Sequence, residues 1–301
     1  MKKRRETIAA LCFLLPNLLG FLLFTLWPVI ASLVLSFASW DLLSPPRWVG
    51  FDNFVDLLGF HRDIDGWTAN DPDFWRFTGN TFFLLLGLPL TMACSLGLAI
   101  LLNQKIRFTY FYRLVFFLPG ILAGVAMFYL WKWVYNPDYG LFNVVLAHLG
   151  IDGPKWLTSV HWAKPAIILM SLWLHAGGQG MLLYLAALQG VSPELHEAAE
   201  IDGANAWQRF RAVTWPSIAP VTFFIFVMGI IGGLQGGFEA AYILTGGGPD
   251  GSTTTIGYYI YTKAYEQFEM GYAAAVAWVL FLLVLGVTLL NWRFGRNNTT
   301  T

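Results

Sequence analysis

The chain has 301 residues, of which 56% are hydrophobic and only 12% are charged. Its 18 lysine and arginine residues balance 18 aspartate and glutamate residues, so the formal net charge is zero. Soluble domains carry about 25% charged residues, so this composition excludes an ordinary soluble protein and indicates an integral membrane protein. A net charge of zero also provides no bulk attraction for nucleic acid.

Apolar stretches long enough to cross a bilayer recur along the chain. Each membrane helix needs roughly 20 predominantly apolar residues. The sequence predicts six spans, near residues 8–36, 80–103, 112–134, 164–188, 217–243 and 272–292. We therefore expect an all-α, polytopic fold in which residues 1–301 form a single transmembrane domain. The first run far exceeds the roughly 7–15 apolar residues of a signal peptide, so we interpret it as an uncleaved span.

Lysine and arginine residues in the connecting segments predict the orientation of these spans. They are concentrated in residues 2–5, at Lys105, Arg107 and Arg113, at Arg209 and Arg211, and near the carboxyl terminus. The alternate segments 37–79, 135–163 and 244–271 are longer and carry few of them. We expect both termini and the loop 189–216 to be cytoplasmic.

Ionisable side chains are rare inside the predicted spans. His175 is the one titratable group well inside a span, and a lone histidine there more often hydrogen-bonds a neighbouring helix than relays protons. Asn80, at the start of the second span, could either cap that helix or face the solute pathway. Ion-coupled carriers depend on such groups within the membrane, so the sequence disfavours a self-sufficient secondary carrier.

The glycine-rich segment 246–253, "GGGPDGST", has the glycine spacing of a phosphate-binding loop. Ser252 stands where that motif requires a lysine, so we interpret the segment as a glycine-rich turn. The chain also lacks recognisable motifs for a metal site or a catalytic nucleophile, so we expect neither enzymatic activity nor a cofactor in this chain. Any ATP that drives transport must then be hydrolysed by another subunit.

The polar segment 192–216 separates the fourth and fifth predicted spans. Ser192 is a favourable helix N-cap, Pro193 fits the first helical position, and Gly203 fits the left-handed residue after a helix. These residues bound a helix of about ten residues. Pro216 and Pro220 are expected in the first turn of the fifth span.

A helix this short is marginal in water by itself, so it needs a surface to dock against. Leu195, Ala198, Ala199 and Asp202 share one face, and three glutamates, Glu194, Glu197 and Glu200, lie along its flanks. Two interpretations stay open on these grounds. The helix either fits a groove on a partner protein or belongs to an amphipathic loop on the membrane surface.

At these residues the chain resembles the inner-membrane permeases of ATP-binding-cassette importers. Their signature is E-A-A, three residues, G, nine residues and I-x-L-P; here it reads Glu197-Ala198-Ala199, Gly203 and Val213-Thr214-Trp215-Pro216. Val213 and Trp215 depart from the signature but remain apolar. The resemblance covers nearly the whole chain, and "LTGGGP" at 244–249 is similar to one of the two permease types of carbohydrate importers.

The resemblance implies a type I importer permease fold and sugar import by alternating access across the inner (plasma) membrane of a bacterium or archaeon. It implies four kinds of partner: a second homologous permease, two ATPase subunits that bind ATP and magnesium, a sugar-binding protein outside the membrane, and the sugar. The short helix corresponds to the coupling helix that enters a cleft of the ATPase. The residues assigned to coupling are Leu195, Glu197, Ala198, Ala199, Asp202 and Gly203.

The resemblance also implies a solute pathway near the residues that precede the glycine-rich turn. The candidate pathway residues are Gln235, Gly236, Gly237, Phe238, Glu239 and Tyr242, with Gln179 and His175 in the fourth span. Amides, hydroxyls and aromatic rings are the groups that bind sugars. An alternative is a permease for a non-sugar solute such as a glycerol phosphodiester, although the spans lack the basic residues that an anion would need.

Overall fold

A computed structural model describes residues 2–64, 66–104, 107–122 and 124–296 of the chain. Two groups of basic residues that predict the orientation are affected: Lys105 lies outside the described residues, and the side chains of residues 2–5 are not described. The chain divides into two compact units. Of the described residues, one unit contains those up to Phe74 together with Tyr259–Phe281, and the other contains those within Trp75–Tyr258 and those from Leu282 onward.

The first unit begins with a long apolar helix. Helix α1 (Lys2–Phe21), the π-helix η1 (Leu22–Leu26) and α2 (Trp27–Leu35) follow one another without a break. Two small antiparallel sheets come next, β1 (Ala38–Ser39) with β2 (Arg47–Trp48) and β3 (Phe60–Asp63) with β4 (Gly66–Ala69), separated by α3 (Asp52–Leu58). Helix α15 (Ile256–Tyr261) leads into this unit, followed by η4 (Thr262–Glu266) and the first half of α16 (Met270–Arg296).

Long-range hydrogen bonds hold the first unit together. The carboxylate of Asp71 accepts hydrogen bonds from the hydroxyls of Tyr259, at 2.6 Å, and Tyr272. Trp278 Nε1 donates to Ser32 Oγ at 3.2 Å, which joins α16 to α2. Segments from the two ends of the sequence are thereby paired inside one unit.

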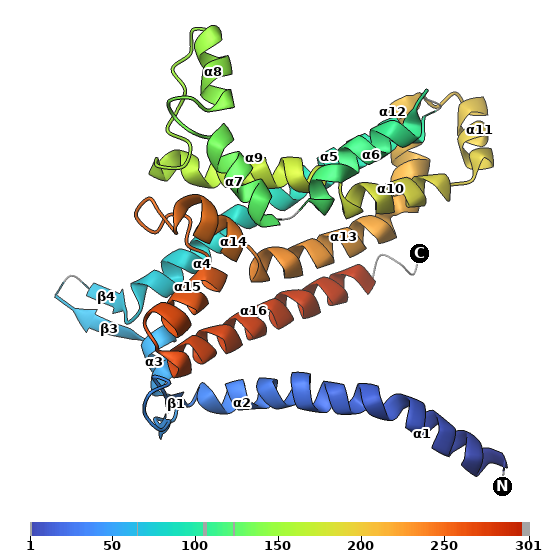
Figure 1. Ribbon diagram of the computed structural model, residues 1–301. Coiled ribbons are helices and arrows are strands. Elements are labelled where there is room, and N and C mark those ends of the chain that lie inside the picture. The colour runs from blue at the N-terminus through green and yellow to red at the C-terminus, as the bar shows by residue number, and fades with distance from the viewer. Residues whose placement is uncertain (1, 65, 105–106, 123, 297–301) are drawn as a thin grey trace. The chain divides into compact units, whose positions relative to one another are not determined.

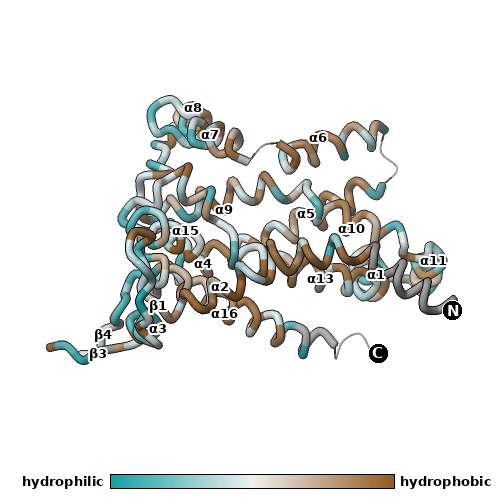
Figure 2. Tube along the Cα trace, turned by 60° about the horizontal axis from the view of Figure 1, so that its bottom comes forward, coloured by the Kyte–Doolittle hydropathy of each residue, from teal (hydrophilic) through white to brown (hydrophobic). Residues whose placement is uncertain are grey.

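The second unit is built almost entirely of helices. Its elements are α4 (Pro72–Leu85), α5 (Gly87–Asn103), α6 (Thr109–Ile121), α7 (Gly124–Val134), α8 (Leu141–His148), α9 (Val160–Ala176), α10 (Gln179–Gln189), α11 (Pro193–Ile201), α12 (Ala206–Arg209), η2 (Phe210–Thr214), α13 (Trp215–Gln235), α14 (Phe238–Ala240) and η3 (Ala241–Thr245). Helix α5 packs against α9, α10 and α13, as Figure 1 shows. These helices are largely hydrophobic along their length, whereas α11 is mostly hydrophilic (Figure 2).

Among the described residues, two buried hydrophobic clusters contribute to the core of the second unit. Ala99, Met181, Tyr184 and Ile218 belong to the cluster that joins α5, α10 and α13. The other cluster joins α7, α9 and the segment around η3, and it is rich in aromatic residues. Helix α9 also packs against α5 and α10, so α5, α9, α10 and α13 are packed together and frame the candidate site.

Membrane-crossing helices are present, but the predicted bounds need correction. Among the described residues, Phe13–Leu35, Pro72–Asn103, Ala206–Gln235 and Met270–Asn291 are each long and apolar enough to cross a bilayer. Two bent pairs raise the number to as many as six. Residues 112–134 and 164–188 are thus not single helices: α6 and α7 are bent by 96°, and α9 and α10 by 45°. The predicted span 217–243 ends at Gln235 instead, because Gly236 and Gly237 leave helical geometry.

The second predicted span begins earlier than residue 80, and Asn80 is not its cap. Helix α4 starts at Pro72, where the Asp71 carboxylate accepts a hydrogen bond from the backbone N–H of Phe74 at 3.0 Å. Asp73 and Arg76 lower the hydropathy of these first turns without ending the helix. A run of apolar residues therefore locates the membrane-embedded part of a helix and misses the polar turns that extend it.

Pro216 lies in the first turn of α13, as expected, whereas Pro220 lies inside that helix. Helix α13 in turn continues the helix that begins at Ala206, so both prolines lie within one apolar helix, Ala206–Gln235. A proline lacks the N–H that the α-helical ladder uses and crowds the carbonyl four residues earlier. The π-helical turn η2 lies directly before these prolines, and Trp215 donates its N–H to Phe210 O there. This wider turn lets the helix continue through the proline-containing segment.

Candidate functional site

Helix α11 has the ends that the sequence predicts. The Ser192 side chain accepts a hydrogen bond from the N–H of Glu194 at 3.3 Å, and Pro193 is the first helical residue. Gly203 has φ +78°, the left-handed conformation that favours glycine, and its N–H donates to Glu200 O at 3.0 Å. The prediction of a short, self-capped helix is confirmed.

The surface of α11 is open in this chain. None of its residues is buried, and the side chain of Leu195 is 52% exposed. Glu197 and Ala198 are exposed, Ala199 is half-buried, and Asp202 caps the carboxyl end in an exposed position. The helix therefore presents carboxylates and small residues to its surroundings, which is the surface a partner groove needs.

One of the three flanking glutamates is already paired within the chain. Glu200 Oε2 accepts from Arg209 Nη1 at 2.7 Å. Arg209 ends helix α12, whose N-cap Asn205 and third residue Gln208 form a reciprocal capping box with bonds of 3.0 and 2.8 Å. Glu194 and Glu197 form no ion pair among the described residues, so they remain available to basic groups of a partner.

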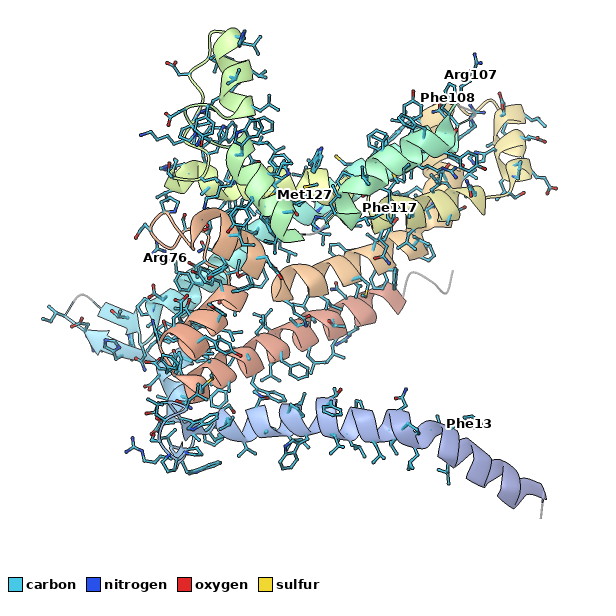
Figure 3. The ribbon with its side chains drawn as sticks, viewed as in Figure 1. Phe13, Arg76, Arg107, Phe108, Phe117 and Met127 are labelled. Carbon is cyan, nitrogen blue, oxygen red and sulfur yellow. The ribbon has the colours of Figure 1, made fainter. Side chains whose placement is uncertain are left out.

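A cavity of about 960 Å³ lies among α5, α9, α10, α13 and α14. Most of its lining is apolar, including Phe117 of α6, which is labelled in Figure 3. Its polar side chains are Thr91, Ser95, Ser171, His175, Gln179 and Glu239. Five glycines from α13 and the segment after it also line the cavity and expose backbone there. Glu239 is the single carboxylate among the described lining residues, and that lining contains no lysine or arginine.

The cavity brings together five of the eight candidate pathway residues. They are His175, Gln179, Gly236, Gly237 and Glu239. Gln235, Phe238 and Tyr242 do not line it. Phe238 and Tyr242 stack on each other instead, with ring centroids 5.5 Å apart and planes at 12°, and both rings also contact Tyr258.

Among the described residues, the hydrogen bonds of His175 stay within α9 and do not reach a neighbouring helix as expected. Its Nδ1 donates to the carbonyl of Ser171, one turn earlier in α9, at 2.8 Å, and Ser171 Oγ lies 3.3 Å from the same atom. Because this bond uses Nδ1, the Nε2 atom remains for another ligand. Ser171 was not a candidate from the sequence, since a serine in an apolar helix usually bonds its own backbone.

The glycine-rich segment forms a compact loop, in agreement with the prediction of a turn. Gly246, Gly247 and Gly251 have φ of 60°, 82° and 62°, and Thr245 Oγ1 lies 2.6 Å from Thr253 Oγ1. Sequence reasoning missed the residues that hold this loop. Asn80 donates to the carbonyls of Gly251 and Thr254 at 2.8 and 3.0 Å, and the guanidinium of Arg76, labelled in Figure 3, pairs with the Asp250 carboxylate at 2.7 Å.

Comparison with known proteins agrees with this architecture. Residues 76–296 match the family described as "Binding-protein-dependent transport system inner membrane component". The probable ABC transporter permease protein YesP of Bacillus subtilis is 37% identical and aligns with 95% of this chain and 90% of its own. The lactose transport system permease protein LacF of Rhizobium radiobacter is 34% identical, with 98% and 96% covered.

A solved structure also resembles the whole chain. The bacterial alginate ABC transporter, crystallised with an alginate pentasaccharide-bound periplasmic protein, contains a chain with a TM-score of 0.85 and 26% sequence identity. The match covers 100% of this chain and 98% of that one. The family match spans more than half of the sequence and includes α11 and the cavity. The chain is therefore a multi-pass membrane permease that belongs to the family of inner-membrane components of binding-protein-dependent transport systems.

Proposed function

We propose that this chain forms half of the translocation pathway of an ATP-driven sugar importer. The single observation that carries the sugar assignment is the cavity of about 960 Å³ together with the polar groups that line it. Its size lies in the range of small-molecule sites, about 300–1,000 Å³. The amide of Gln179, the hydroxyls of Thr91, Ser95 and Ser171, and the carboxylate of Glu239 suit the hydroxyl groups of a saccharide.

The charge of the cavity lining favours a neutral sugar. An anionic solute would meet the Glu239 carboxylate without a guanidinium or ammonium group from the described lining. Removing a phosphate or uronate from water without such a partner is costly. The lining therefore argues against a glycerol phosphodiester, and also against acidic saccharides such as alginate, the pentasaccharide of which is bound by the periplasmic protein in the related structure.

Energy for import comes in this proposal from a partner ATPase that binds ATP and magnesium, because Ser252 replaces the essential lysine of a phosphate-binding loop. The exposed helix α11 is the element that would meet this ATPase, through Leu195, Ala198 and Ala199 and through the two free carboxylates. The remaining partners are a second permease, which completes the pathway, and a sugar-binding protein that docks outside the membrane. The chain itself performs no chemistry on the solute.

Purification of the assembled transporter tests this function. We expect the chain to be isolated in detergent with a second permease and an ATPase, identified by mass, and with a binding protein whose melting temperature a neutral disaccharide such as lactose raises. In liposomes, labelled disaccharide should accumulate when ATP is supplied and should not accumulate with a non-hydrolysable ATP analogue. Glu239→Gln and Gln179→Ala should reduce uptake while leaving the assembly intact.

Two results would contradict the proposal. Solute flux through the isolated chain without ATP would indicate a secondary carrier. Uptake of alginate oligosaccharides in preference to neutral disaccharides would contradict the role assigned to Glu239, while leaving an ATP-driven permease in place.

A further inference from the structure

The ion pair between Glu200 and Arg209 connects two elements with different surroundings. Glu200 lies in the last turn of α11, the exposed helix, and Arg209 lies in α12. Helix α12 continues through η2 into α13, and the resulting helix of 30 residues, Ala206–Gln235, is long and apolar enough to cross the membrane. The 2.7 Å contact therefore joins the surface helix directly to a membrane helix.

Little else fixes the angle of α11 in this chain. The helix has no buried residue. A cavity of about 460 Å³ lies between it and the ends of the membrane helices, lined by His196 of α11 and by Asn103 and Gln104 at the end of α5. Among the described residues, Glu200–Arg209 is the one ion pair that α11 forms. Helix α11 lies against α12 and η2 without burying any of its own residues, so this ion pair is its one charged side-chain attachment among the described residues.

The strength of this contact depends on its solvent exposure. The Arg209 side chain is 29% exposed and the Glu200 side chain 70%, and ion pairs this exposed contribute little in water. When a partner covers α11, water leaves the pair. A fall in the effective dielectric constant from about 80 to about 20 raises the attraction about fourfold at the same distance. The connection is thus weak in the free chain and becomes strong on docking.

We propose that Glu200 and Arg209 are positioning residues that transmit the movement of α11 to α13. This inference rests on the proposed function, since it assumes that an ATPase moves α11. With the pair intact, α11 and the helix Ala206–Gln235 move as one body, and α13 carries that movement to the large cavity, which Met228, Gly229 and Gly232 help to line. With the pair broken, α11 swings on the linker around Gly203 and the ATPase hydrolyses ATP without opening the cavity.

Substitutions that reverse the charge of Glu200, of Arg209 or of both in the assembled transporter test the proposed role of the ion pair. A cysteine reporter is introduced by Met228→Cys, at a position that lines the cavity and is 52% exposed, after Cys12 and Cys94 are replaced by alanine. The complex in liposomes is treated with a membrane-impermeant maleimide, with and without ATP and vanadate, and ATP hydrolysis is measured in parallel. We expect a change in labelling rate of about tenfold with the native pair.

Glu200→Arg and Arg209→Glu should each retain ATP hydrolysis and lose most of this change, and the double variant should recover it. Recovery by exchange distinguishes transmission from a merely structural role. Arg211→Gln serves as the control, because Arg211 is exposed two residues further on and forms no ion pair among the described residues.

Three outcomes would contradict one of the two proposals. If both single variants kept the full ATP-dependent change in labelling rate, the positioning role would be overturned. Loss of the ATPase from a single variant, without recovery in the double variant, would do the same, because Glu200 or Arg209 would then contact the ATPase directly. Absence of any ATP-dependent change with the native pair would instead contradict the proposed transport function.

Discussion

Two loops of the second unit differ in what holds them. The loop that contains α11 is bounded by neighbours in sequence: Ser192 and Pro193 begin the helix and Gly203 ends it. The glycine-rich segment 246–253 and Thr254 after it are held by a distant residue. Asn80 donates hydrogen bonds to the carbonyls of Gly251 and Thr254, which lie 171 and 174 positions later in the chain. A locally bounded helix keeps its outer face free for a partner, whereas a loop bonded to a distant helix is part of the folded core. Changes in the first loop should therefore affect coupling, and changes in the second should affect stability.

The largest effect is expected from Gly203→Pro. Proline cannot adopt φ +78°, and it lacks the N–H that Gly203 donates to Glu200 O. The end of α11 would be lost, and ATP-driven uptake should fall to background while the melting temperature of the purified chain stays within about 2 °C of the wild type. Uptake assays and melting curves measure the two effects.

Gly203→Asn is the matched control for this change. Asparagine tolerates the left-handed conformation and retains the N–H, so this variant should keep most of the uptake. Equal loss of uptake in both variants would show that the glycine is needed for contact with a partner and not for the end of the helix.

The next largest effect is expected from Asn80→Ala. Asn80 is 3% exposed, and its amide donates to the carbonyls of Gly251 and Thr254. Removing it leaves two carbonyls of the loop without that partner, at a cost of about 2–4 kcal/mol. The melting temperature should fall by several degrees. Asn103→Ala, at the exposed end of α5, should leave it unchanged, and equal melting of both variants would contradict the role given to Asn80.

The ends of α11 and the bonds of Asn80 also show which features the sequence could predict. The ends of α11 follow from capping rules that involve residues within a few positions, so they were predicted correctly. Asn80 is a polar residue in an apolar run, a signal that was visible in the sequence. Its partners were not visible, because they depend on how α4 packs against a loop far along the chain.

The break between α9 and α10 is a second feature that the sequence could not supply. The pair Gly177–Gly178 is plain in the sequence, but glycines also occur in straight membrane helices. A Cβ on Gly177 would lie 2.1 Å from the carbonyl oxygen of Phe116, so close approach of α6 requires the glycine there. The position of the cavity depends on this bend, and so Thr91, Ser95 and Ser171 could not be assigned to its lining from the sequence.

A smaller effect on stability is expected from a change at Tyr259. Like Asn80, this residue bonds to a partner far away in the sequence, because its hydroxyl donates to Asp71, 188 positions earlier. Burial, and then the hydrogen bond to Asp71, raise the pKa of the Tyr259 hydroxyl above its usual value of 10.0. Because the folded-state pKa is raised, this contribution to stability is complete below about pH 10 and is lost as the pH rises further.

Melting temperatures measured between about pH 8 and about pH 11 test this pKa shift. Tyr259→Phe should be less stable than the wild type near pH 8, because it lacks the 2.6 Å hydrogen bond to Asp71. Above pH 10 the difference in melting temperature between the wild type and Tyr259→Phe should narrow, because the tyrosine ionises and the phenylalanine does not. A gap that stays constant across this range would contradict the raised pKa.

The smallest effect is expected from Asp250→Asn. The Arg76–Asp250 ion pair spans the same loop and helix as the Asn80 bonds, but its side chains are 43% and 78% exposed. Such pairs contribute about 0–1 kcal/mol and are screened by salt. The Arg76 guanidinium also donates to the backbone carbonyl of Asp250, which the substitution retains. The melting temperature should therefore fall by less than in Asn80→Ala, and this small difference should disappear in about 1 M salt. A loss as large as that of Asn80→Ala would mean that surface charge holds the glycine-rich loop, and the contrast between a locally bounded helix and a core-bonded loop would then have to be given up.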